Sequence, residues 1–129
     1  MIISQLRVQN FRCILDESLP CEELTALVGP NGSGKSSFLR ALEMLYTIST
    51  KYTEHDFYNE DTSKDIIITV EFTQLTEDEK ILFQKYVEGE NLTVEKVVKW
   101  PPERGSQKYY GTSLQNPDFG VMVCSVLLF

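Results

Sequence analysis

The sequence has few of the residues on which disulfide and metal sites depend. Its three cysteines, Cys13, Cys21 and Cys124, show no C-x-x-C spacing. An odd number without that spacing argues against a disulfide framework or a zinc site and predicts reduced cysteines in a cytoplasmic protein. His55 is the single histidine and lies in a polar stretch. We therefore expect His55 to be a solvated loop residue, with little support for a His-based metal site or a Ser-His-Asp triad.

Basic charge and long apolar runs are also scarce. Twelve Lys and Arg face nineteen Asp and Glu, for a net charge of −7. Bulk charge therefore does not predict a nucleic-acid-binding surface, although local basic patches remain possible. No apolar run approaches the roughly 20 residues of a membrane helix, and no cationic segment precedes an apolar core at the N-terminus. We expect no membrane partner and no signal peptide, and 129 residues allow at most one domain.

The clearest feature present is a phosphate-binding pattern, G-x-x-x-x-G-K-[ST]. It comprises Gly29, Pro30, Asn31, Gly32, Ser33, Gly34, Lys35 and Ser36. Its glycines let the backbone wrap tightly and turn its N–H groups toward phosphates. Lys35 is predicted to reach the β- and γ-phosphates, and the Ser36 hydroxyl to hold Mg²⁺. The pattern therefore predicts a site for ATP and Mg²⁺.

The flanking sequence supports this prediction. Residues 24–28 form a short apolar run, interpreted as a buried strand that leads into the loop. A helix is expected from about Lys35, so that its positive end faces the anion. Over residues 36–47 a polar stripe alternates with a broad apolar face of Phe38, Leu39, Leu42 and Leu45. A Gly-rich turn without a ligand is the alternative, and the strand–loop–helix context favours the phosphate site.

The remaining pattern predicts mostly strands. Residues 2–8 and 14–19 read as an antiparallel hairpin beside the nucleotide site, and residues 49–65 as a long surface excursion with one helical turn near 54–58. The other expected elements are a strand over 66–72, a helix opened by a capping box at Thr76 and ended by Gly89, a strand over 92–100, its hairpin partner over 107–112, and a terminal apolar strand over 121–129. Such a terminal strand predicts pairing within a larger sheet.

A known group is resembled by two features of this sequence. One is the order of a strand, Asn10-Phe11-Arg12 and a second strand, and the other is the Pro-Asn-Gly form of the loop. The sequence is similar to the N-terminal part of ABC-type ATPases of the SMC, Rad50 and RecF kind and of OLD-family ATP-dependent nucleases. The resemblance implies an α/β P-loop lobe, with a mixed sheet and antiparallel hairpins around the P-loop helix. It places Arg12 and Ser37 near the nucleotide, although an exposed strand-end arginine is the alternative for Arg12. It also implies ATPase heads that pair as a homodimer or oligomer, and DNA as a partner of the full-length protein.

Several family features are missing, among them the acidic clusters of a Toprim nuclease domain. Residues 66–68 run into Thr69-Val70-Glu71 rather than into the Asp-Glu of a Walker B strand, so Glu71 is expected to face solvent. No Ser-Gly-Gly signature occurs. We therefore interpret residues 1–129 as the N-terminal portion of an incomplete ATPase domain, without catalytic residues of its own. The expected role is ATP binding for an ATPase of DNA repair or phage defence. A nucleotide-binding regulatory module and a P-loop kinase or GTPase remain alternatives, although no Asn-Lys-x-Asp guanine motif is present.

Overall fold

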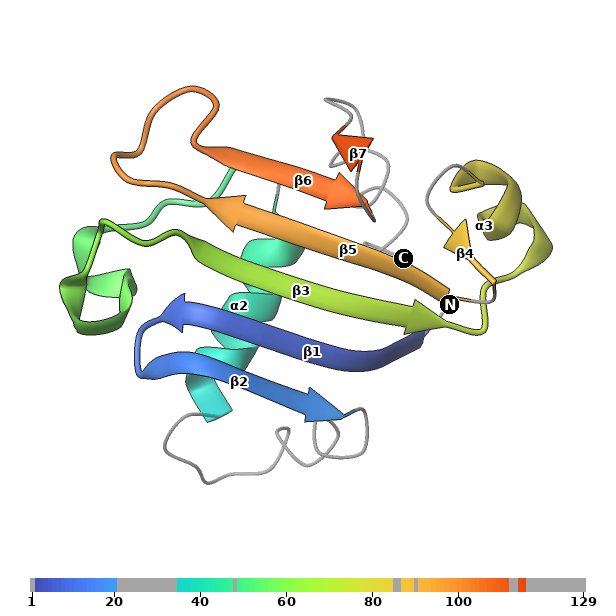
Figure 1. The fold of residues 1–129 in the computed structure, drawn as a ribbon, viewed down its shortest axis with the longest axis horizontal. Helices are drawn as coiled ribbons and strands as arrows, with labels where there is room; N and C mark the ends of the chain where they lie inside the picture. The colour runs from blue at the N-terminus through green and yellow to red at the C-terminus, as the bar shows by residue number, and fades with distance from the viewer. Residues whose placement is uncertain are drawn as a thin grey trace.

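The fold is built on one sheet with a helix across one face. The computed structural model describes residues 2–20, 35–47, 49–84, 87–89, 91–111 and 114–115. Within these residues, seven strands form the sheet in the order β2-β1-β3-β5-β6-β7, with β4 paired to β5 outside this path, and every described pair is antiparallel (Figure 1). The strands are β1 (Ile2–Phe11), β2 (Ile14–Pro20), β3 (Ile66–Thr73), β4 (Val87–Glu88), β5 (Asn91–Val98), β6 (Gln107–Gly111) and β7 (Leu114–Gln115). The helices are α2 (Lys35–Tyr46) and α3 (Glu77–Leu82), with 3-10 turns η1 (Glu54–Asp56) and η2 (Tyr58–Glu60).

The sheet follows the alternation of its sequence. Along β3, buried and half-buried residues alternate without interruption, and along β5 the even-numbered positions are buried. Because side chains on a strand point alternately to the two faces, one face of the sheet is apolar and the other polar. The strands predicted over 2–8, 14–19 and 66–72 and the first hairpin are confirmed, with small extensions. The strand predicted over 107–112 is confirmed as β6, Gln107–Gly111. The strand predicted over 92–100 ends two residues earlier, at Val98.

Helix α2 covers the apolar face and packs against β1 and β3 (Figure 1). Its start at Lys35 confirms the predicted helix. Phe38, Ala41, Met44 and Leu45 are buried beneath it. Leu39 was expected on the buried face but is 40% exposed. The helix therefore meets the sheet along a narrower stripe than its apolar residues predicted.

Residues 49–65 are not simply a surface excursion. The helical turn predicted near 54–58 is present as η1 and η2. Between these turns Phe57 is 1% exposed and forms a bridge with Phe11, while Tyr52 is also buried. Two aromatic side chains therefore fix this segment to the core, which a reading of its many polar residues did not foresee.

The helix after the capping box is shorter than predicted. Thr76 and Glu79 form the box as expected, with Glu79 N donating to Thr76 Oγ1 at 3.2 Å. The helix then ends at Leu82, because Phe83 turns into the core as its C-cap. Gly89 does not end it: with φ +62 it lies between β4 and β5. The strands predicted over 24–28 and 121–129 lie outside the described residues.

In the part of the chain that the structure describes, no helix is long and apolar enough to cross a membrane.

Candidate functional site

The N-terminal end of α2 is the starting point of the candidate site. The first turn of α2 contains Lys35, Ser36, Ser37 and Phe38 and no acidic residue. Helix N-termini carry a partial positive charge that acidic side chains commonly neutralise. The first turn of α2 therefore contributes no acidic side chain that would neutralise this charge. Residues 29–34 lie outside the described part, as do the side chains of Lys35 and Ser36, so their predicted roles stay predictions.

Ser37 connects this end of α2 to the β1–β2 hairpin. Its side chain is buried, and its Oγ lies 3.4 Å from Cys13 Sγ. Cys13 is in the two-residue turn between β1 and β2, directly after Arg12. The β1–β2 hairpin therefore reaches the first turn of α2, and its place beside a nucleotide site stays a prediction.

Arg12 has a defined protein partner in this turn. Its backbone N–H donates to the Asp56 carbonyl at 2.8 Å, and its side-chain Nε donates to Asp56 Oδ1 at 3.1 Å. The residue has φ +53, a conformation that non-glycine residues seldom adopt. The Arg12 side chain is 39% exposed and that of Asp56 17%. Arg12 is thus a partly exposed residue after the end of β1 that pairs with Asp56, and its place near the nucleotide stays a prediction.

The partner of Arg12 belongs to a small, ordered turn. Asp56 Oδ2 accepts from Thr53 N at 2.9 Å, and Thr53 Oγ1 accepts from His55 N at 3.3 Å, so the two residues form a capping box. His55 itself is 70% exposed, which confirms the expectation of a solvated residue. Figure 1 shows η1 and η2 at the end of the sheet where the β1–β2 turn lies. An open hollow there is lined by Arg12, Cys13, His55, Asp56, Phe57, Asn59 and Glu60.

Asn10 holds the far end of the same segment. Its side-chain Nδ2 donates to the Lys64 carbonyl at 2.8 Å, and the residue is buried with φ +57. Its Oδ1 is buried and has no hydrogen-bond partner among the described residues. All three residues of Asn10-Phe11-Arg12 therefore contact residues 53–65: Asn10 donates to Lys64 O, Phe11 forms a backbone bridge with Phe57, and Arg12 pairs with Asp56.

The C-terminal end of α2 carries a second polar contact that the sequence did not predict. Lys96 is fully buried on β5, and its Nζ donates to the carbonyls of Met44 at 2.6 Å and Thr47 at 2.7 Å. On β6, the Tyr109 hydroxyl donates to Leu45 O at 2.6 Å. The only sequence signal was a lysine at an inward position of an alternating strand.

Comparisons with known proteins place this arrangement in a family. Residues 1–122 match the family described as the AAA ATPase domain. The chain belongs to this family. The OLD nuclease of Thermus scotoductus is 42% identical over 76 residues, which cover 55% of this chain and 14% of that protein. This chain thus spans about a seventh of the relative.

Solved structures show the fold of the ATPase domain. One comes from work titled as the structural biochemistry of ATP-driven dimerization and DNA-stimulated activation of SMC ATPases. Its TM-score is 0.65 and its sequence identity is 18%. The match covers 98% of this chain and 77% of that chain. The SMC head domain from Thermotoga maritima has a TM-score of 0.56, 16% identity and coverage of 90% and 39%. The fold is that of an SMC-type ATPase head, described here in part. The expected P-loop ATPase family, with an OLD-like relative, is confirmed.

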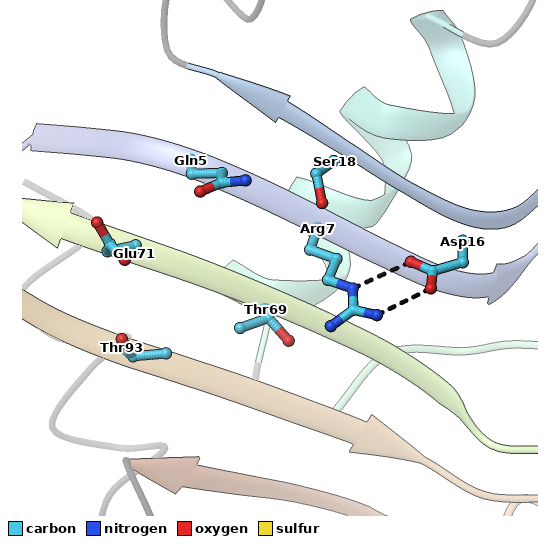
Figure 2. A pocket seen from close by; sticks show the side chains of 7 residues that line it. All are labelled: Gln5, Arg7, Asp16, Ser18, Thr69, Glu71 and Thr93. Carbon is cyan, nitrogen blue, oxygen red and sulfur yellow. Dashed lines mark hydrogen bonds and ion pairs between the residues drawn. The ribbon is translucent and has the colours of Figure 1, made fainter.

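The opposite face of the ATPase domain's sheet is polar and lies away from α2. Figure 2 shows an open hollow there, lined by Gln5, Arg7, Asp16, Ser18, Thr69, Glu71 and Thr93. Arg7 donates to both carboxylate oxygens of Asp16, at 3.0 and 2.8 Å. The hydrogen bond and charge of Arg7 lower the pKa of Asp16, and Asp16 raises that of Arg7. Glu71 accepts from Ser4 Oγ at 3.0 Å on this face, and is therefore remote from the helix that it would have to serve as a Walker B residue.

Proposed function

We propose that residues 1–129 are the N-terminal, nucleotide-binding portion of the ATPase domain and bind ATP with Mg²⁺ at the start of α2. The main observation behind this proposal is that the first turn of α2 has no acidic side chain. The β1–β2 turn, which holds Arg12, contacts this first turn through Cys13 and Ser37. Family membership supports the assignment, because ATPase domains use a nucleotide. The donor set also fits: hydroxyls, one lysine and one arginine suit a polyanion and a hard cation.

Each residue has a separate proposed role. The backbone of residues 29–34 surrounds the phosphates, and Lys35 contacts the β- and γ-phosphates. Ser36 provides a hydroxyl ligand to Mg²⁺, and bound Mg²⁺ neutralises phosphate charge. Arg12 and Ser37 border the site from the hairpin and from the helix. These roles make the chain a cradle for the nucleotide.

Hydrolysis requires a further group that orients water. Glu71 is placed on the far face of the sheet by its contact with Ser4, so it is poorly positioned for that task. We therefore assign no catalytic residue to this chain, and propose that groups outside it complete the active site. A nucleotide-binding module without hydrolysis is the second candidate function, and the position of Glu71 is the observation that favours it.

The relatives guide the proposal about partners. The SMC work names ATP-driven dimerization and DNA-stimulated activation, and the Thermus protein is called a nuclease. We propose that the complete protein pairs through its ATPase heads as a homodimer or oligomer. We propose that it acts on DNA in repair, processing or phage defence, in the cytoplasm.

Calorimetric titration with Mg-ATP tests the proposed site. Lys35→Ala should abolish measurable binding, because the cationic contact to the phosphates is lost. Lys108→Ala is the matched control: Lys108 is an exposed lysine of β6 and should be removable without effect. Competition with GTP and UTP separates an ATPase site from the site of a P-loop kinase or GTPase. Equal affinity of the wild-type and Lys35→Ala proteins would refute the assignment.

A further inference from the structure

The contact between Arg12 and Asp56 joins two parts of the chain that are 44 residues apart. Two hydrogen bonds form this contact. The Arg12 backbone N–H binds the Asp56 carbonyl, and the Arg12 side-chain Nε binds Asp56 Oδ1. Backbone and side chain are thus fixed to the same residue, which restricts the direction in which the guanidinium can point.

The geometry of the guanidinium gives this contact a consequence. Arginine presents five N–H donors in a rigid, planar fork. Asp56 engages the Nε edge, which leaves the two terminal Nη groups at the other end of the plane. A phosphate is best bound by such a planar pair of donors. An arginine held at Nε therefore keeps the part that suits a phosphate.

Asp56 is itself held firmly. Its second oxygen, Oδ2, accepts from Thr53 N at 2.9 Å, and the next residue, Phe57, is buried and forms a backbone bridge with Phe11. Its side chain is 17% exposed, against 39% for that of Arg12. This rigid support distinguishes the pair from an ordinary surface ion pair, which contributes little.

We propose that Asp56 is a positioning residue for nucleotide binding: it orients Arg12 so that the terminal nitrogens of the guanidinium contact a phosphate of ATP bound at the start of α2. This rests on the proposed function, because Arg12 is assigned to the nucleotide there. Asp56 then supports the phosphate site from outside, through its bond to Arg12. Asp56 touches Arg12 and not the nucleotide.

A double-mutant cycle on Mg-ATP affinity tests this proposal, measured by calorimetry on the full chain. Asp56→Ala should weaken binding about five- to tenfold, the size expected for losing one well-oriented charge-assisted hydrogen bond. Arg12→Ala should weaken it at least as much. In the Arg12→Ala background, Asp56→Ala should have no further effect, because Asp56 acts only through Arg12.

Two controls separate positioning from general loosening of the fold. Thr53→Ala disrupts the other half of the capping box, the bond from His55 N, and leaves the Asp56 carboxylate in place. Its affinity should stay within about twofold of wild type, since Arg12 keeps its partner. Asp16→Ala breaks the Arg7–Asp16 pair, a matched ion pair on the far face of the sheet, and should leave affinity unchanged.

The possible failures are distinguishable. Binding that is insensitive to Lys35→Ala would refute the proposed function. Binding that depends on Lys35 but is equally affected by Asp56→Ala with and without Arg12 would refute the positioning role alone. Tighter binding by Asp56→Ala would also overturn it, because the carboxylate would then compete with ATP for Arg12.

Discussion

The Lys96 ammonium lies 2.6 Å from the carbonyl oxygen of Met44, at the end of α2 opposite the proposed phosphate site. Helix C-termini carry a partial negative charge and carbonyls without partners in the helix. A buried cation donating to two of these carbonyls neutralises both features. It also fixes the P-loop helix to β5. The two ends of α2 therefore have separate tasks: one is held by the sheet, and the other faces the proposed ligand.

Loss of this cation should destabilise the protein. Lys96→Met keeps the apolar length of the side chain but leaves buried carbonyls with fewer donors. We expect a decrease of roughly 2–4 kcal/mol in the free energy of unfolding, the cost of breaking a buried charged contact. Urea denaturation followed by circular dichroism measures it. Lys108→Met on neighbouring β6 is the control and should change stability by less than about 0.5 kcal/mol.

Tyr109 should be coupled to Lys96. Its hydroxyl donates to Leu45 O at 2.6 Å and Thr47 O at 3.1 Å, and Thr47 O also accepts from Lys96. Tyr109→Phe should cost about 1–2 kcal/mol of unfolding free energy, the value for a buried hydrogen bond. Because the two residues share an acceptor, the effects of Tyr109→Phe and Lys96→Met should not add. Additive effects in the double variant would show that the two contacts are independent.

Phe57 should determine whether residues 49–65 stay attached to the sheet. It is 1% exposed and its ring lies 6.3 Å from that of Tyr52 and 6.0 Å from that of Trp100. Phe57→Ala removes a large buried ring, and such changes cost about 3–5 kcal/mol when the cavity cannot collapse. We expect faster proteolysis within 49–65 before global unfolding, detected by mass spectrometry of the fragments. Tyr58→Ala, at the adjacent and less buried position, should leave the cleavage rate near that of wild type.

The Arg7–Asp16 pair should give an acid-sensitive contribution to stability. Arg7 lowers the pKa of Asp16 in the folded state through its hydrogen bond and charge. The contribution is therefore fully present above the ordinary aspartate pKa and is lost as pH falls through the lowered folded value. Arg7→Gln should raise the pKa of Asp16 in a carboxyl-detected NMR titration. Lys108→Gln should leave that titration in place, and an unshifted Asp16 in Arg7→Gln would show that the pair is not formed in solution.

Local sequence patterns predicted the strands and the starts of the helices better than they predicted where helices end or which residues contact one another. The alternation in β1 and β3 and the capping box at Thr76 are local, and all three are present. The end of α3 depends on where Phe83 finds space in the core, which no local pattern records. Lys96 is similar: this inward lysine donates to carbonyls at the end of α2, including that of Thr47, 49 residues earlier in the chain. For the candidate site, the pattern of residues 29–36 predicted the helix start, but the pairing of Arg12 with Asp56 required the fold.

Catalysis is the final test of how much of the active site this chain holds. Orientation and charge stabilisation of an attacking water lower the barrier by several kcal/mol, and each ~1.4 kcal/mol is a factor of ten in rate. Glu71 follows the apolar run that was compared with a Walker B strand. It accepts a hydrogen bond from Ser4 on the face of the sheet away from α2. We therefore expect phosphate release from the 129-residue chain in saturating Mg-ATP to equal that of Lys35→Ala. Adding the remainder of a complete relative, in the same chain or separately, should raise the rate only when Lys35 is intact. If the chain alone hydrolyses ATP in a Lys35-dependent manner, Glu71→Gln shows whether this carboxylate is responsible, and the assignment of the water-activating group to another segment would be wrong.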